Sequence, residues 1–351
     1  MKRIPIAILG ATGAVGQRMI QLLQNHPWFE IAVLTGSDRT VGRPYGELVN
    51  WVLDGNPPSS VANMIVQPSD QVNADVAIAL SALPTAAATT YEPLWAAETA
   101  VCSNASSYRM TADVPLIIPE VNPEHVHLID VQRHQRGWRG ALVTNPNCSV
   151  IGIAMALKPL ADTVGLQHVH AATLQAISGA GYPGVASMDI IDNIIPNIAN
   201  GVEEEKIESE PRKIMAKLQH DALISAEFTI SAQVTRVPVI DGHTALLSIK
   251  TARHLGIDDV TRIYQNYQPP QQVRDLPSAP AQALIVHEQA DRPQPRRDRN
   301  AGNGMSVSLG RIRSCPINDI RMVVLSHNTI RGAAGGAILN AELLVATGYT
   351  Q

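Results

Sequence analysis

A glycine-rich turn near the start of the chain places the strongest constraint on its fold. Residues 4–9 form an almost continuous apolar run, typical of a strand buried on both faces of a parallel sheet. The sequence Gly10-Ala-Thr-Gly13-Ala-Val-Gly16 follows, and the apolar residues after it fall on one face of a helix: Val15, Met19, Leu22 and Leu23. A second apolar run covers residues 31–34. This order predicts a βαβ unit of a Rossmann-type parallel sheet.

The glycine turn favours a dinucleotide ligand over the alternative, a tight βα turn without one. Glycines let the backbone approach a pyrophosphate, and the helix start supplies free N–H groups. An NAD enzyme should place an acidic residue after the second strand, whereas Ser37 and Arg39 here are suited to a 2'-phosphate. We therefore predict NADP as the cofactor. Asp38 keeps NAD open, and a solvated loop cation is the other interpretation of Arg39.

The rest of the chain predicts a second domain of different character. Two further strands, 76–80 and 100–102, end in polar loops at the edge where open α/β sheets bind ligands. Beyond residue 147 the runs alternate between apolar and polar residues, which indicates an α+β domain with a mainly antiparallel sheet. We predict a Rossmann domain over residues 1–147, to which a terminal helical segment, 327–351, returns, and a catalytic and oligomerisation domain over 148–326. Between its strands lie a charged segment, 201–213, and a Pro/Arg-rich one, 291–303, which composition alone predicts to be a loose linker.

Composition limits the class of partner. The length of 351 residues suits two domains, and 45% hydrophobic with 17% charged residues is a globular composition. A net charge of −4 gives no general attraction to nucleic acid or to an anionic membrane, so a small molecule is the expected partner. Three widely spaced cysteines indicate a reducing compartment, and no signal peptide or run of roughly 18 apolar residues is present. We expect a cytoplasmic protein and assign no residue to a metal.

Cys148 is the candidate nucleophile. It follows a Pro-Asn pair at a predicted helix start, where the helix dipole favours a thiolate, whereas Cys102 and Cys315 lie in strand-like surroundings and are expected to be small buried hydrophobes. A thiolate needs a proton partner, and His243 stands out among the 11 histidines because it follows a strand end and an Asp-Gly turn. Chemistry alone leaves three other histidines open as partners: His168, His170 and His220.

Several motifs, in order along the whole chain, together resemble aspartate-semialdehyde dehydrogenase of the archaeal and fungal type. They are the glycine turn, Ser81-Ala-Leu-Pro84, Asn145-Pro-Asn-Cys-Ser149, Gln175-Ala-Ile-Ser-Gly179, Arg236-Val-Pro-Val-Ile-Asp-Gly-His243, Arg292-Pro-Gln-Pro-Arg-Arg-Asp-Arg299 and Ser326-His-Asn-Thr-Ile-Arg-Gly-Ala-Ala334. The resemblance implies a homodimer or homotetramer that reduces aspartyl phosphate with NADPH, through a thioester on Cys148, to aspartate semialdehyde and phosphate. That reaction belongs to lysine, threonine and methionine biosynthesis.

The resemblance also implies roles for individual residues. His243 is the general acid/base, and Gln175 orients the substrate at the cysteine. Arg236 pairs with the substrate carboxylate, Glu203 meets the substrate amine and Lys206 meets phosphate; Arg109 and Asn147 complete the phosphate site. The cofactor contacts implied are Gly10, Thr12, Gly13, Ala14, Val15, Ser37, Arg39, Ser81, Leu83, Ser178, Gly179 and Asn328. From the sequence alone, residues 203–213 would be a solvated helix face.

Two positions depart from the pattern of the family, and two other functions remain as alternatives. Ala245 stands where close relatives carry a glutamate, and Gly336 stands where the bacterial branch has a polar residue. Malonyl-CoA reductase would use the same cysteine, histidine and NADP, but malonyl-CoA has no amine for Glu203 to bind. A nucleotide sensor without turnover would not need both Cys148 and His243.

Overall fold

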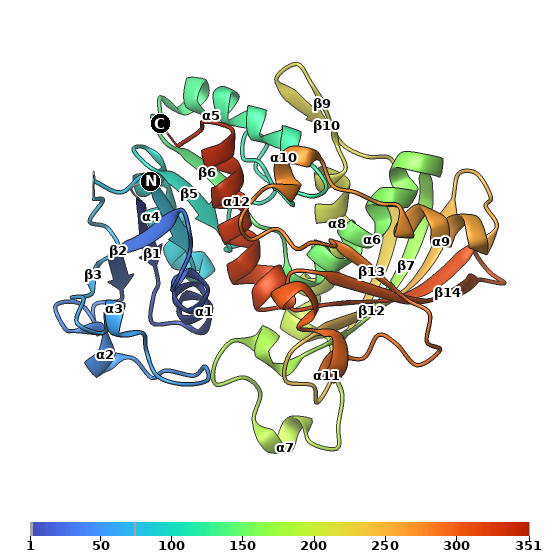
Figure 1. Ribbon diagram of the computed structural model, residues 1–351, viewed down its shortest axis with the longest axis horizontal. Helices are drawn as coiled ribbons and strands as arrows, with labels where there is room; N and C mark the ends of the chain where they lie inside the picture. Colours follow the sequence, from blue (N-terminus) through green and yellow to red (C-terminus); the bar gives the residue numbers. More distant parts are fainter. Residues whose placement is uncertain (1–2, 74, 351) are drawn as a thin grey trace.

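The first sheet of the computed structural model is parallel and carries the glycine turn. The structure describes residues 3–73 and 75–350; residues 1–2, 74 and 351, which fall within the predicted domain ranges, lie outside the described residues. Six strands pair in the order β3-β2-β1-β4-β5-β6 (Figure 1). Their bounds are β1 Ile4–Leu9, β2 Phe29–Gly36, β3 Gln67–Pro68, β4 Ile78–Ser81, β5 Ala100–Ser103 and β6 Ala141–Thr144. The Rossmann-type sheet is confirmed, and its strand order reverses between β1 and β4.

Short helices connect and cover this sheet. They are α1 Ala14–Leu23, α2 Tyr45–Leu48, α3 Ser59–Ala62, α4 Thr85–Ala96 and α5 Leu128–Arg136. β4, β5 and β6 are buried along their whole length, as expected of strands covered on both faces. Because these strands are covered on both faces, their residues can reach a ligand only at the strand ends, and the carboxyl ends of β1 and β4 form one such place.

The second sheet is mixed, and four of its six strand pairings are antiparallel, so the mainly antiparallel sheet is confirmed. Its order is β13-β14-β15-β12-β7-β11-β8. The bounds are β7 Leu166–Gln175, β8 Ile195–Pro196, β11 Thr229–Arg236, β12 His243–Thr251, β13 Leu284–His287, β14 Val307–Ser314 and β15 Ile320–Ser326. A separate hairpin joins β9 Lys217–Gln219 to β10 Ala222–Ile224.

Helices cover one face of this sheet and leave alternate residues of the other face exposed. The helices of this part are α6 Cys148–Val164, α7 Ser187–Ile190, α8 Val202–Ile214, α9 Ile257–Gln265, α10 Gln271–Arg274 and α11 Pro295–Asp298. α6, α8 and α9 share one hydrophobic core with the buried residues of the central strands. Leu174 of β7 and Leu246 of β12 remain 37% and 42% exposed on the uncovered face.

The end of the chain returns to the first sheet. A π-helical turn, η5 Ile330–Ala334, leads into α12 Gly335–Ala346, drawn in red near the centre of Figure 1. The side chains of Ile338 and Leu339 share a core with Ile6 and Ile8 of β1. The tail therefore packs with the N-terminal part, although it follows the last strand of the second sheet. Among the helices of the described residues, none combines the length and apolar character needed to cross a membrane.

Three interpretations of the sequence are corrected by the packing. The charged segment 201–213 forms α8, but it is not a solvated helix face, because Glu203, Glu210 and Lys213 are buried. The Pro/Arg-rich segment is no loose linker: Arg292 pairs with Asp298, and a Cβ on Gly310 would lie 2.3 Å from the Arg292 carbonyl oxygen. Cys315 is half-buried in the turn after β14 rather than buried in a strand.

Candidate active site

The residues expected to act on the substrate gather at one edge of the second sheet. β7 and β11 run parallel and end together at Gln175 and Arg236, which are partners in register. β12 is antiparallel to β7, so its first residue, His243, lies at the same edge. Cys148 begins α6, which packs against β12. Sheet topology thus brings together four residues that are far apart in the sequence.

Cys148 is the first residue of α6, and its neighbour Asn147 caps that helix. The Asn147 side-chain oxygen accepts hydrogen bonds from the backbone N–H groups of Ser149 and Val150 at 2.9 and 3.4 Å. The Cys148 sulfur lies 3.2 Å from Nε2 of His243. A Cβ on Gly332 of η5 would come within 2.8 Å of the Cys148 Cβ, so only glycine allows η5 to approach Cys148 this closely. Gly332 was not among the site residues predicted from the sequence.

The surroundings of His243 fix where its proton lies. The backbone N–H of Ala176 donates to Nδ1 at 3.0 Å, which leaves the proton of the neutral ring on Nε2, facing the sulfur. Burial, reinforced by the charge of Arg236, lowers the pKa of His243 to about 3. The ring is therefore a neutral hydrogen-bond donor toward Cys148 at physiological pH.

The other three candidate histidines have a different environment. His168, His170 and His220 are all exposed side chains, whereas His243 is buried. His168 lies 3.2 Å from the side-chain oxygen of Asn318, at the far end of β7 from Gln175. The geometry therefore places only His243 of these four against the sulfur.

The charges around Cys148 have opposing effects on its ionisation. Burial, with the nearby carboxylate of Glu203, raises the pKa of the Cys148 thiol to about 12. The positive charges of Arg109, Lys206 and Arg236 act in the other direction. The helix start alone would favour a thiolate, but desolvation outweighs it, and the sulfur is protonated in the free site.

Glu203 and Lys206 form a charged pair beside Cys148. Lys206 Nζ lies 2.7 Å from one oxygen of Glu203, and Asn147 Nδ2 donates to the other at 2.8 Å. Burial alone would raise the pKa of Glu203, but Lys206 and Asn147 hold that pKa below its ordinary value. The acid is therefore an anion at physiological pH, able to meet a cationic group.

Three buried polar side chains keep donors available for a ligand. Within the described residues, Gln175 Nε2 and Arg109 Nε are buried without a hydrogen-bond partner. Arg236 donates from one guanidinium nitrogen to the Ala176 carbonyl at 2.8 Å, and Gly179 leaves room beside it. Since buried donors are normally paired, the unpaired donors of Gln175 and Arg109 indicate that a ligand completes the site.

The glycine turn at the end of β1 is shaped to hold a phosphate-containing cofactor. Gly10 has a positive φ of 77°, and a Cβ there would meet the Ala82 carbonyl oxygen at 3.0 Å. A Cβ on Gly16 would come within 2.5 Å of the Gly10 oxygen. α1 begins after Gly13 without a side-chain cap, so the first N–H groups of the helix, at Ala14 and Val15, are open to an anion.

The remaining candidate cofactor residues flank this turn on both domains. Ser37 and Arg39 are exposed just beyond β2. Ser81 is the last residue of β4 and Leu83 follows beside Gly10, and both are buried. On the other side, Asn328 donates to the Ser178 hydroxyl at 2.7 Å. A cavity of about 260 Å³ lies between the two groups, lined by residues that include Ala14, Ser178 and Thr329. Thr12 lies in the turn itself.

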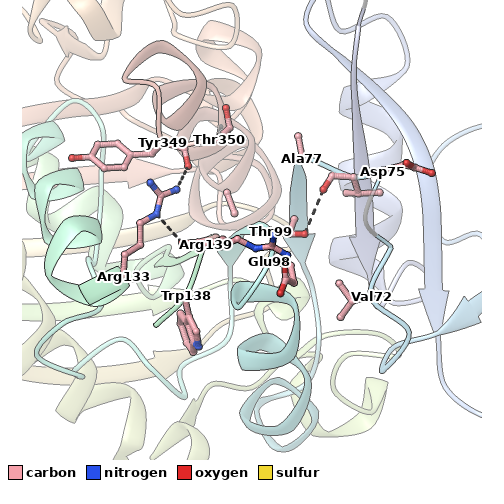
Figure 2. A pocket seen from close by; sticks show the side chains of 13 residues that line it. Val72, Asp75, Ala77, Glu98, Thr99, Arg133, Trp138, Arg139, Tyr349 and Thr350 are labelled. Atoms are coloured by element: carbon pink, nitrogen blue, oxygen red, sulfur yellow. Dashed lines mark hydrogen bonds and ion pairs between the residues drawn. The ribbon is translucent and has the colours of Figure 1, made fainter. Parts of the chain in front are cut away.

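A larger cavity, of about 1020 Å³, lies at the opposite edge of the first sheet (Figure 2). It is lined by the amino ends of β4, β5 and β6, with Arg133 and Trp138 on one side and Val72 and Asp75 on the other. Ligands of open α/β sheets bind at the carboxyl ends of the strands, where Cys148 and the glycine turn lie. The large cavity is therefore separate from the candidate site.

The two positions that depart from the family pattern have local explanations. Ala245 of β12 is buried in the core of the second domain, and the Ala176 N–H provides the partner for His243 Nδ1. A Cβ on Gly336 would lie 2.7 Å from the side-chain oxygen of Asn145 and from the Arg331 carbonyl, so the close packing of α12 excludes a larger residue.

The fold and site define a class of protein: a two-domain dehydrogenase with a glycine turn for a dinucleotide in one domain and a Cys148–His243 pair at the border with the other. Family models agree: one described as semialdehyde dehydrogenase, NAD binding domain, matches residues 5–129, and one described as semialdehyde dehydrogenase, dimerisation domain, matches residues 157–331. The chain belongs to the aspartate-semialdehyde dehydrogenase family.

Individual relatives support this assignment. Aspartate-semialdehyde dehydrogenase of Archaeoglobus fulgidus is 48% identical, over 98% of each chain. The crystal structure of aspartate semialdehyde dehydrogenase with NADP from Candida albicans matches with a TM-score of 0.90 and 39% identity, covering 99% of this chain and 100% of that one. Malonyl CoA reductase (NADP) of Metallosphaera sedula is 40% identical, over 99% of this chain and 98% of the relative.

Proposed function

We propose that this enzyme catalyses the reversible, NADPH-dependent reductive dephosphorylation of L-aspartyl 4-phosphate to L-aspartate 4-semialdehyde. The observation that carries the proposal is the pairing of Cys148 and His243 at 3.2 Å, with the Glu203–Lys206 pair beside it. The substrate has an amine, a carboxylate and a phosphate. Glu203 is an anion for the amine, while Arg236, Arg109 and Lys206 are cations for the other two groups.

The first half of the reaction forms a thioester on the chain. The Cys148 thiol attacks the acyl carbon and passes its proton to an oxygen of the substrate phosphate, a tetrahedral oxyanion forms, and the C–O bond breaks to release hydrogen phosphate. Gln175, with its unpaired buried amide, orients the acyl group. Asn147, Arg109 and Lys206 receive the departing phosphate, and their positive or N–H groups stabilise its charge.

The second half returns the cysteine. Bound NADPH supplies the hydride that reduces the thioester carbonyl. The Nε2–H of His243 faces the reacting sulfur and donates a hydrogen bond to the oxyanion of each half. Collapse of the alkoxide breaks the C–S bond and releases the aldehyde and the thiolate, without a proton transfer. This geometry supports the donor part of the acid/base role predicted for His243.

The glycine turn and its neighbours are the proposed NADP site. The open N–H groups at the start of α1 suit the pyrophosphate, and the exposed Arg39 with Ser37 suits a 2'-phosphate. We assign Ser81, Leu83, Ser178, Gly179 and Asn328 to the nicotinamide end of the site, because Gly179 lies against His243, the neighbour of Cys148. The presence of NADP in the related Candida albicans structure supports the same cofactor here.

One comparison of activities tests the proposal against malonyl-CoA reductase. We expect phosphate-dependent reduction of NADP by aspartate semialdehyde, and no oxidation of NADPH by malonyl-CoA. The ion pair of Glu203 favours the first substrate, because malonyl-CoA has no amine to occupy it. Activity with malonyl-CoA alone would overturn the assignment of substrate. Turnover by Cys148→Ala with either substrate would overturn the thioester mechanism.

We also propose how the chain is divided and assembled. The cores support a cofactor domain of residues 1–147 with 327–351 and a catalytic domain of residues 148–326. The uncovered sheet face with Leu174 and Leu246 supports a homodimer or homotetramer through the catalytic domain. Three cysteines without a disulfide support a reducing, cytoplasmic location. Light scattering of Leu246→Glu, expected to shift the protein toward monomer, tests the interface.

A further inference from the structure

Helix α8 carries two further charged residues, Glu210 and Lys213, that the proposed reaction does not use. Glu203, Lys206, Glu210 and Lys213 follow one another at helical spacing and therefore share one face of α8. The first two meet each other beside Cys148. The last two are buried, and they contact the loop of the cofactor domain that carries Arg109.

Glu210, in the catalytic domain, joins two separate segments of the cofactor domain. One of its oxygens accepts from Arg109 Nη1 at 3.0 Å, and the other accepts from the backbone N–H of Asn147 at 2.7 Å. The side chain is 2% exposed. Burying a carboxylate this deeply costs free energy of folding unless both oxygens are paired. Here one oxygen pairs with Arg109, which is assigned to the phosphate site, and the other pairs with the turn before Cys148.

The bond to Glu210 determines which part of the Arg109 guanidinium is free. Nη2 donates to the Asn104 carbonyl at 2.7 Å, and Nη1 donates to Glu210. Nε is buried and has no partner among the described residues. Both terminal nitrogens of the guanidinium are thus paired within the protein, and Nε remains available to bind an anion.

Lys213 fixes the backbone of the same loop. Its Nζ donates at 2.7 Å to three carbonyl oxygens, those of Arg109, Thr111 and Val114. All three bonds go to the loop between β5 and α5. Glu210 therefore holds the Arg109 side chain while Lys213, one helical turn away, holds its main chain.

We propose that Glu210 is a positioning residue for the phosphate group of the substrate. Its carboxylate sets the separation between the Arg109 guanidinium and the Asn147 turn, and Lys213 supports the loop. Helix α8 then holds the phosphate group in position relative to Cys148, at the border between the domains. The inference rests on the proposed function, because it requires phosphate to be the leaving group.

Glu210→Gln tests this role, since the amide keeps the shape but can accept only one of the two hydrogen bonds. With aspartate semialdehyde as substrate, we expect the KM for phosphate to rise about ten- to hundredfold, because a bond to a charged group is lost. The KM for NADP should not change. The matched control is Glu205→Gln, which removes a charge from the exposed face of α8 and should leave both values unchanged.

A second measurement separates positioning from a merely structural role and does not need turnover. Inorganic phosphate should protect Cys148 of the wild type from iodoacetamide, and Glu210→Gln should need a correspondingly higher phosphate concentration. Equal protection of variant and wild type, or lower thermal stability with an unchanged KM for phosphate, would overturn the inference. Absence of any phosphate effect in the wild type would instead overturn the proposed function.

Discussion

The backbone N–H of Ala176 donates a 3.0 Å hydrogen bond to Nδ1 of His243. The residues are 67 positions apart in the sequence, and the bond forms because β7 ends where β12 begins. An imidazolium carries protons on both nitrogens, so protonation of His243 would set Nδ1–H against this N–H. Ala245 offers no carboxylate that could compensate. This backbone contact therefore fixes the tautomer, with the proton toward Cys148, while burial and the charge of Arg236 keep the ring neutral.

Stability should fall in acid because His243 resists protonation. Its folded pKa is about 3, below the unfolded value of about 6.5, so between these limits the unfolded chain binds a proton that the folded chain does not. The free energy of unfolding then decreases as the pH falls, with a slope of up to about 1.4 kcal/mol per pH unit from this residue. Urea unfolding of wild type and His243→Asn over this range measures the slope.

His327 provides the internal control for that experiment. Burial lowers its pKa to about 4, so it contributes a slope of the same sign in both proteins. His243→Asn should therefore lose acid sensitivity only in part. An unchanged slope in the variant would mean that His243 is protonated in the folded state.

The reactivity of Cys148 should increase when Glu203 is neutralised. The carboxylate raises the pKa of the thiol, so Glu203→Gln lowers that pKa and increases the thiolate fraction at neutral pH. The rate of alkylation by iodoacetamide, followed against pH, should shift toward lower pH in the variant. Glu205→Gln, on the exposed face of the same helix, controls for a general change of charge. A profile that stays in place would show that burial alone sets the thiol pKa.

The carboxylate of Glu203 would also let the substrate help to activate Cys148. In the proposed binding mode, the substrate ammonium group would cancel the charge that opposes ionisation of Cys148, as the Gln variant does. The thiol is thus kept protonated in the free enzyme, and ionises most readily when the site is filled.

Cofactor preference should depend on Arg39. The side chain is exposed after β2, where a 2'-phosphate is expected. Arg39→Ala should raise the KM for NADP about ten- to hundredfold, through loss of a charged hydrogen bond, and leave the KM for NAD unchanged. Steady-state kinetics with each cofactor measures the split. If both KM values rise together, Arg39 stabilises the loop after β2 and does not bind the 2'-phosphate.

Sequence patterns predicted the elements whose signal is local. The run before Gly10, the glycine turn and the helix start at Cys148 are set by neighbouring residues, and the structure has all three. The strand order of the second sheet depends on long-range pairing and was not predictable. The burial of Glu210 and Lys213 was missed for the same reason: a charged helix looks solvated until the loop that covers it is known.

A buried ion pair that anchors η5 should matter more to stability than a surface pair. Arg331 of η5 donates to both oxygens of Glu120 at 2.9 and 2.7 Å, and both side chains are 1% exposed. Glu120→Gln leaves the guanidinium charge uncompensated in the interior, which we expect to cost about 3–5 kcal/mol. The matched control, Glu98→Gln, breaks the exposed pair with Arg139 and should cost no more than about 1 kcal/mol.

Urea unfolding of the two variants and the wild type measures this difference in stability. A measurement of kcat shows whether the loss of the pair also affects the active site. Since η5 also carries Gly332, which lies against Cys148, loosening the turn in Glu120→Gln should lower kcat as well as stability. Replacing both Glu120 and Arg331 with methionine removes the unpaired charge, so the double variant should be more stable than Glu120→Gln. If the double variant is the less stable of the two, the packing and geometry of the pair, and not its uncompensated charge, hold η5 in place.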